Sequence, residues 1–228
     1  MNRNPIIVAL DFESPAEASA LIARLGDRVS FYKVGMELYA AAGMAFAREL
    51  RAQGKDVFLD MKFYDIPETV RRAVCQVARA GLQFLTVHGS DAVMRAAVEG
   101  RGAASLKLLA VTVLTSFDRQ DIADLGYPSE VSDLVDLRVR KALAAGVEGI
   151  VASPLDAARI RRIAGPGAIL VTPGVRSPGA AQADQKRVAT PAEAIRDGAD
   201  YVVMGRQITR AASPADEVDR VLEEIASA

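Results

Sequence analysis

Eight short apolar segments are the feature of this sequence that most restricts its fold. They are rich in β-branched residues and span positions 5–11, 29–35, 55–62, 83–89, 106–115, 147–153, 168–174 and 200–206. Most are continuously apolar instead of alternating, as expected for strands that are buried on both faces of a parallel sheet. The sequence therefore predicts eight parallel strands.

Helical patterns, with apolar residues recurring at steps of three and four, separate these segments. The predicted helices span 15–24, 36–52, 67–80, 91–100, 131–145, 155–163, 192–196 and 215–226. Eight strand–helix units in 228 residues predict a closed (β/α)8 TIM barrel, formed by residues 1–228 as a single domain. A doubly wound open sheet is the alternative, but the first strand–helix turn, "LDFESPAEA", lacks the glycine fingerprint of a dinucleotide site.

Charge and cysteine content argue against several classes of partner. The 28 basic and 29 acidic residues nearly cancel, so no global field points to nucleic acid or an anionic membrane. Cys75 is the only cysteine and His88 the only histidine, which permits no internal disulfide and leaves too few ligands for a zinc site. With no visible signal peptide or membrane span, the sequence predicts a cytoplasmic protein. We expect Cys75 in the packed core and His88 in a structural role.

Charged residues stand at the predicted ends of the first three strands, where barrels of this fold carry their active sites. Asp11 ends the first strand, Lys33 lies in the second, Asp60 and Lys62 end the third, and Asp65 follows in the loop. Because Asp60 and Lys62 are two positions apart, an extended backbone places both on one face, which we expect to be the barrel mouth. A solvated rim or a structural ion pair is the alternative interpretation.

The chemistry of this group suggests a decarboxylation. Flanking carboxylates favour the ammonium form of Lys62, which suits a proton donor or fixed cation better than a Schiff-base nucleophile. A substrate carboxylate pressed against Asp60 would be destabilised until it left as carbon dioxide. The carbanion left behind would face Lys62. This is a hypothesis at the level of charge alone.

The loops after the seventh and eighth strands supply the parts of a phosphate site, which barrels of this fold frequently build there. Gly205 allows close approach of the backbone, and Arg206 offers a fork of donors to phosphate oxygens. Arg176 and Gln185 lie on a long loop rich in glycine and small residues, which is typical of a lid. A flexible surface loop with a structural arginine is the alternative.

Seven motifs, in this order and spacing, resemble the bacterial-type orotidine 5'-phosphate decarboxylase family over the whole chain. They are "VALD" (8–11), "YKVG" (32–35), "DMKFYDIPETV" (60–70), "VTVLTS" (111–116), "TPGVR" (172–176), "DQKRVATP" (184–191) and "GRQIT" (205–209). The resemblance implies a carboxy-lyase that converts orotidine 5'-monophosphate to UMP and carbon dioxide, the last step of UMP synthesis. It implies no cofactor and no metal.

The resemblance also implies roles for individual residues. Lys62 would protonate C6 within an array of Lys33, Asp60, Lys62 and Asp65. The implied substrate contacts are Asp11 and Lys33 for the ribose, Thr115 with Ser116 as a neighbouring candidate for the pyrimidine, and Arg176, Gln185, Gly205 and Arg206 for the phosphate. A homodimer with shared active sites is implied, in which Asp65 and Thr69 act on substrate held by the other subunit. Ile66, in the same segment, is expected to contact substrate.

The sequence differs from the family pattern at two positions, and two other functions remain as alternatives. Glu68 stands where the family more often has asparagine, and Gly89 where it often has alanine; neither is expected to disturb the proton donor. A magnesium-dependent sugar-phosphate decarboxylase or synthase of the same superfamily could use a similar Asp-Lys-Asp segment. A non-catalytic barrel that binds nucleotide phosphates is the alternative from another class.

Overall fold

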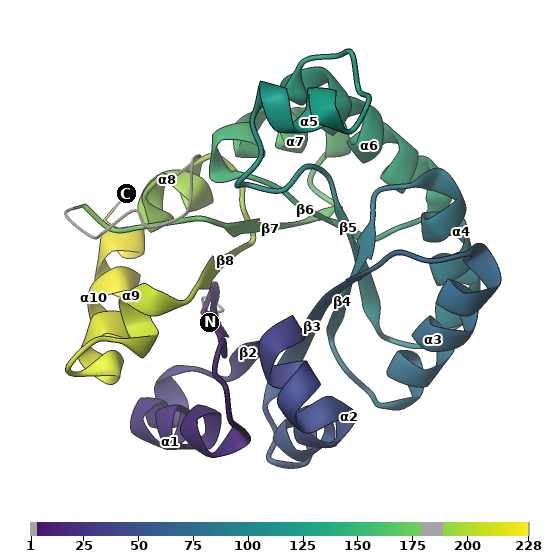
Figure 1. Cartoon of the computed structure of the whole chain (residues 1–228). Coiled ribbons are helices and arrows are strands. Elements are labelled where there is room, and N and C mark those ends of the chain that lie inside the picture. Colours follow the sequence, from purple (N-terminus) through teal and green to yellow (C-terminus); the bar gives the residue numbers. More distant parts are fainter. Residues whose placement is uncertain (1–3, 179–188, 228) are drawn as a thin grey trace.

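A closed barrel of parallel strands forms the centre of the structure (Figure 1), a computed structural model that describes residues 4–178 and 189–227. The strands pair in chain order, and β8 closes the barrel on β1. They are β1 (Ile6–Ala9), β2 (Phe31–Gly35), β3 (Asp56–Phe63), β4 (Phe84–His88), β5 (Lys107–Val111), β6 (Gly149–Val151), β7 (Ile169–Pro173) and β8 (Tyr201–Met204). The predicted (β/α)8 barrel is confirmed.

Helices surround the barrel and connect its strands (Figure 1). They are α1 (Pro15–Leu25), α2 (Met36–Ala52), α3 (Pro67–Arg79), α4 (Asp91–Arg101), α5 (Arg119–Asp124), α6 (Val131–Ala145), α7 (Ala157–Ala164), α8 (Pro191–Arg196), α9 (Arg206–Thr209) and α10 (Pro214–Ala226), with 3-10 turns at Gly26–Arg28 and Pro154–Asp156. The sequence did not predict α5 and α9, which are too short to show apolar periodicity.

Local signals explain where several helices begin and end. The Ser14 hydroxyl accepts the Glu17 amide at 3.3 Å at the start of α1, and Thr190 forms a reciprocal capping box with Glu193 at the start of α8. Gly146, with φ of 83°, ends α6 in the left-handed region that favours glycine. These caps fix the ends of the helices that connect one strand to the next.

Two apolar layers follow from the alternation of side chains along the strands. In β1, Ile6 and Val8 face the outer core beneath the helices, whereas Ile7 and Ala9 face the barrel interior. Phe31, Phe84 and Tyr201 begin their strands and pack together inside, with ring centroids 5.0 to 5.6 Å apart. This aromatic floor closes the barrel interior at its N-terminal end, below the cavity at the C-terminal ends of the strands.

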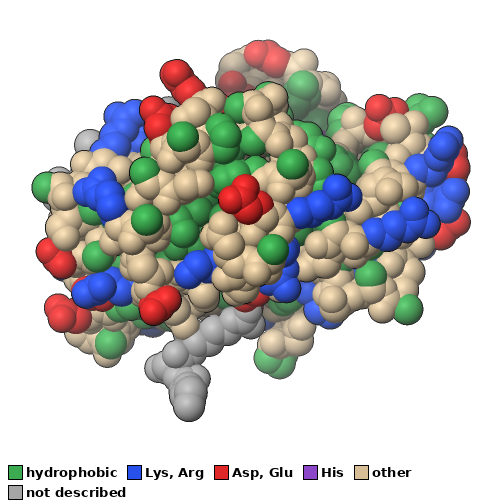
Figure 2. Space-filling model, turned by 90° about the horizontal axis from the view of Figure 1, so that it is seen from below, with side chains coloured by type: hydrophobic (Ala, Val, Ile, Leu, Met, Phe, Trp, Pro, Cys, Tyr) green, Lys and Arg blue, Asp and Glu red, His purple; other side chains and the backbone are tan. Residues whose placement is uncertain are grey.

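The surface carries both signs of charge. Figure 2 shows acidic and basic side chains interspersed over the face seen from below Figure 1, consistent with the near-zero net charge. None of the described helices is long and apolar enough to cross a membrane. Cys75 is only partly buried on α3, so its predicted place in the packed core is wrong.

Candidate active site

A cavity of about 270 Å³ opens at the C-terminal ends of the strands. Its walls include apolar side chains such as Phe58, Val151 and Val203, which stand above the aromatic floor. Its lining also contains eight of the residues that the sequence predicted for a site: Asp11, Lys33, Asp60, Lys62, Thr115, Arg176, Gly205 and Arg206. The structure therefore brings the two predicted halves of the site, the charged strands and the last loops, into one cavity.

Asp60 is the centre of the charged half. Its carboxylate accepts a hydrogen bond from Lys62 Nζ at 2.9 Å and lies 3.8 Å from Lys33 Nζ. Lys33 Nζ in turn donates to Asp11 Oδ1 at 2.9 Å. The side chains of Asp60 and Lys33 are only 16% and 11% exposed, so water screens their attraction weakly. The four residues form one continuous chain of alternating charge.

The ionisation of Asp60 reflects this position. Burial alone would raise the pKa of its carboxyl group, but the neighbouring Lys33 and Lys62 ammonium groups lower it. Hydrogen bonds from Lys62 and from the Thr86 hydroxyl lower it further, and the pKa lies below its ordinary value. The cavity therefore holds a fixed negative charge beside two cations.

The backbone of β3 is irregular where it carries these residues. Leu59 pairs with Leu85 and Phe63 pairs with Val87. Between these two pairs β3 advances by four residues whereas β4 advances by two, so β3 contains a bulge. Lys62 has φ of 48°, the only positive φ of a residue other than glycine in the described chain. Such a conformation costs on the order of 1 to 3 kcal/mol.

Two arginines stand at the other side of the cavity. Arg176 follows β7, and its backbone amide bonds to the Ala189 carbonyl at 3.0 Å. Arg206 begins α9, directly after Gly205. Burial and the charge of Arg206 lower the pKa of Arg176, because the two guanidinium groups are close enough to repel each other. An anion bound here would relieve this repulsion.

Other predicted site residues do not reach this cavity. Asp65, Ile66, Thr69 and Ser116 are exposed, and none of them lines it. The Asp65 carboxylate accepts the Ile66 amide at 2.6 Å, and within the described residues it forms no ion pair with either lysine of the array. Gln185 lies outside the described residues.

The sequence of the chain matches one protein family over most of its length. Residues 4–221 match the profile of the "Orotidine 5'-phosphate decarboxylase / HUMPS family". The chain belongs to this family.

Relatives of known name agree with this assignment. Orotidine 5'-phosphate decarboxylase of Rhodopseudomonas palustris strain BisA53 is 52% identical over 99% of this chain and 96% of its own. The enzyme of the same name from Caulobacter sp. strain K31 is 49% identical over 99% of both chains. The crystal structure of orotidine 5'-phosphate decarboxylase from Lactobacillus acidophilus superposes with a TM-score of 0.87 at 32% identity, covering 98% of this chain and 99% of that one.

Two parts of the site in this family member were missed by sequence reasoning. A Cβ atom on Gly35 would lie 2.9 Å from Lys33 Nζ and 3.2 Å from Asp11 Oδ1, so this glycine leaves room for their ion pair. Thr86, fully buried in β4, bonds to both Asp60 and Lys62. The sequence did contain a signal for Thr86, because it is a polar residue inside the apolar segment "FLTVH".

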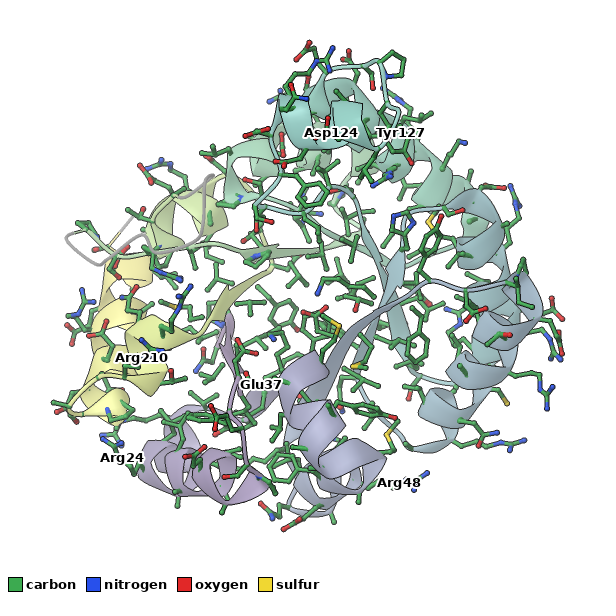
Figure 3. The ribbon with its side chains drawn as sticks, viewed as in Figure 1. Arg24, Glu37, Arg48, Asp124, Tyr127 and Arg210 are labelled. Atoms are coloured by element: carbon green, nitrogen blue, oxygen red, sulfur yellow. The ribbon has the colours of Figure 1, made fainter. Side chains whose placement is uncertain are left out.

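A second cavity of about 440 Å³ adjoins the first and shares Lys62 with it. The Tyr64 ring packs on His88 with centroids 4.1 Å apart, and burial, aided by the charge of Arg138, lowers the pKa of His88. Buried Arg138 donates to the Tyr127 hydroxyl at 3.0 Å; Tyr127 is labelled beside α6 in Figure 3. Gly89 leaves room for β5 and for Arg138, because a Cβ there would lie 2.7 Å from the Val111 carbonyl oxygen and 3.1 Å from Arg138 Cδ.

The last two observations concern Glu68, which differs from the family pattern, and possible metal ligands. Glu68 forms a two-pronged pair with Arg71, with both N–O distances 2.8 Å, and so turns away from the charge array. Among the residues that the structure describes, no three His, Cys, Asp or Glu side chains are placed to hold a metal ion.

Proposed function

We infer that this chain catalyses the decarboxylation of orotidine 5'-monophosphate to UMP and carbon dioxide. The observation that carries the inference is the Lys33–Asp60–Lys62 array, which is partly buried and shares one cavity with two arginines. Membership of the family and about 50% identity to relatives named as this decarboxylase over their full length support it. The chain is then a carboxy-lyase with a small-molecule nucleotide substrate.

The arginines would hold the phosphate end of the substrate. The charge of Arg206 disfavours the charge of Arg176, and a phosphate dianion between the two arginines would make a charge-assisted contact with each. Gly205, at the start of α9, would present backbone amides to the same oxygens. Gln185 is proposed as a further contact. This binding, remote from the reacting carbon, would supply energy for assembling the reactive end.

The ribose and pyrimidine would lie between these arginines and the charge array. We propose that Asp11 and Lys33, paired at 2.9 Å, contact the ribose hydroxyls. Thr115 lines the cavity beyond the end of β5 and is proposed to contact the pyrimidine, whereas Ser116 lies outside the cavity lining. This orientation would place the substrate carboxylate near Asp60.

The array would then carry the reaction in two steps. The fixed charge of Asp60 disfavours the bound carboxylate, and this repulsion is relieved as the bond from C6 to the carboxyl carbon breaks. The electron pair stays on C6, where the Lys62 ammonium stabilises it. Lys62 transfers its proton to C6, giving UMP, and the resulting amine regains a proton from solvent. We propose that no cofactor or metal takes part.

We further propose that the active enzyme is a cytoplasmic homodimer. Asp65, Ile66 and Thr69 face solvent instead of their own cavity, as expected if they serve the site of a second subunit. Tyr64 and Ile66 are each 67% exposed, which is unusual for large apolar side chains and favours burial by another chain. Tyr64, Asp65 and Ile66 would then belong to an interface.

Mixing two inactive variants tests the shared site. A mixed dimer of Asp65→Asn and Lys62→Ala subunits contains one site in which both residues are intact, so activity should return. If mixed dimers form but stay inactive, Asp65 does not act on the partner's substrate.

The activity itself is tested with purified protein, orotidine 5'-monophosphate and EDTA. We expect the orotate absorbance to disappear in the presence of the chelator. Turnover of a ribulose- or gulonate-type sugar phosphate with magnesium, lost with EDTA, and no turnover of orotidine 5'-monophosphate would favour the sugar-phosphate decarboxylase or synthase instead. Saturable binding of UMP without any turnover of orotidine 5'-monophosphate would favour the non-catalytic barrel.

A further inference from the structure

Thr86 is a polar residue at a fully buried position of β4. Its neighbours Leu85 and Val87 are fully buried in the outer core, and Thr86 itself is 0% exposed. Alternation along the strand puts Thr86 on the interior side with Phe84, one layer above the aromatic floor. A buried hydroxyl is costly unless it is hydrogen-bonded, so its partners indicate what it does.

Both partners of Thr86 belong to the charge array. Its Oγ1 accepts a hydrogen bond from the Lys62 backbone amide at 2.8 Å and donates to Asp60 Oδ1 at 2.9 Å. The direction of the second bond is set by chemistry, because an ionised carboxylate can only accept. Lys62 Nζ donates to the same oxygen, Asp60 Oδ1, at 2.9 Å. The backbone and the side chain of Lys62 are therefore tied to one Thr86–Asp60 unit.

The irregularity of β3 explains why this tie is needed. Between Leu59 and Phe63 the register of β3 on β4 shifts, and within this irregular stretch the Lys62 amide donates to the Thr86 side chain. The Thr86 hydroxyl therefore holds the backbone at the residue whose φ is 48°. Without it, the unusual conformation of Lys62 would lose a hydrogen bond that opposes its relaxation.

We propose that Thr86 is a positioning residue of the reaction: its hydroxyl orients the Asp60 carboxylate and holds the Lys62 backbone so that the ammonium group faces the reacting carbon. This inference rests on the proposed decarboxylase function. Thr86 does not line the cavity and acts only through Asp60 and Lys62. Its hydroxyl also helps to keep the pKa of Asp60 low, which preserves the negative charge.

The test compares Thr86→Val, which removes the hydroxyl at nearly constant shape, with Thr86→Ser, which keeps it. Hydrogen bonds to charged groups are strong enough that we expect kcat of Thr86→Val to fall about 10- to 100-fold. Thr86→Ser should stay within about threefold of wild type, because the donor and acceptor remain. The Kd for UMP should change by less than about threefold in both, since the phosphate and ribose contacts are untouched.

A pH profile adds a readout that a purely structural role would not move. Without the hydroxyl, the pKa of Asp60 rises, so the acid limb of kcat/KM should shift to higher pH in Thr86→Val. Thr172→Val is the matched control: Thr172 is also 0% exposed in a strand, but its hydroxyl bonds to the Tyr201 carbonyl at 3.3 Å. That variant should keep the wild-type kcat and pH profile.

Several results would overturn the proposal. They are kcat of Thr86→Val within threefold of wild type, an equal loss in Thr86→Ser, or an equal loss in Thr172→Val. If Thr86→Val does not fold, Thr86→Cys replaces it, and a kcat equal to that of Thr86→Ser refutes the role of the hydroxyl. Wild-type protein that is inactive on orotidine 5'-monophosphate would contradict the proposed function instead, so the two failures are distinguishable.

Discussion

Asp60→Asn removes the central charge of the array while nearly preserving its shape. At an effective dielectric constant of about 20, the lost attraction is about 6 kcal/mol to Lys62 Nζ at 2.9 Å and about 4 kcal/mol to Lys33 Nζ at 3.8 Å. Desolvation offsets part of this, and breaking a buried pair costs about 3 to 5 kcal/mol in practice. If transition-state stabilisation falls by that amount, kcat/KM drops about 10²- to 10⁴-fold.

The assay is the initial rate of orotate absorbance loss, with circular dichroism and UMP binding to verify the fold of the variant. Asp219→Asn is a suitable control, because Asp219 pairs with Arg28 at 2.7 Å but both side chains are nearly half exposed. Exposed pairs contribute little, so this control should keep kcat/KM within about twofold. A folded Asp60→Asn variant with kcat/KM within tenfold of wild type would mean that the charge of Asp60 does not stabilise the transition state.

Two further predictions concern the phosphate side and the single histidine. Arg206→Ala should lose about 2 to 4 kcal/mol of transition-state stabilisation in steady-state kinetics, and an unchanged kcat/KM would exclude Arg206 as a phosphate contact. Because the pKa of His88 is lowered in the folded protein, the unfolded chain takes up its proton first as pH falls through about 6.5, and stability is lost below that pH. Thermal unfolding should therefore show a smaller loss of Tm between about pH 7 and 5 in His88→Gln than in wild type. Equal losses in both proteins would mean that another group controls stability in this range.

The barrel could be predicted because its signal is repeated along the whole chain. Most of the buried strands are continuous apolar runs, and each longer helix has its own apolar periodicity. An error at a single element therefore does not change the predicted fold. The short helices α5 and α9 were missed because each buries a single side chain, Ile122 and Ile208, which establishes no apolar period. The cluster at the barrel mouth followed from the fold, because strand ends converge there.

The detailed geometry of β3 could not be predicted in the same way. Placing Asp60 and Lys62 on one face assumed a regular strand, and both do line the cavity. The actual backbone is bulged, and Lys62 takes a left-handed conformation that no local sequence pattern announces. The polar character of Thr86 is visible in the sequence, but its partners Asp60 and Lys62 on β3 are not, and neither is the closeness of Gly35 to the Lys33–Asp11 pair.

The most direct test of the central claim is the fate of C6 when the reaction is run in D₂O with EDTA. Wild-type protein is expected to form UMP with one deuterium at C6, delivered by the exchanged ammonium group of Lys62. Lys62→Ala, compared by NMR in the same solution, should form no UMP above the uncatalysed rate. UMP deuterated at C6 and made by Lys62→Ala within a hundredfold of the wild-type rate would mean that Lys62 is not the proton donor.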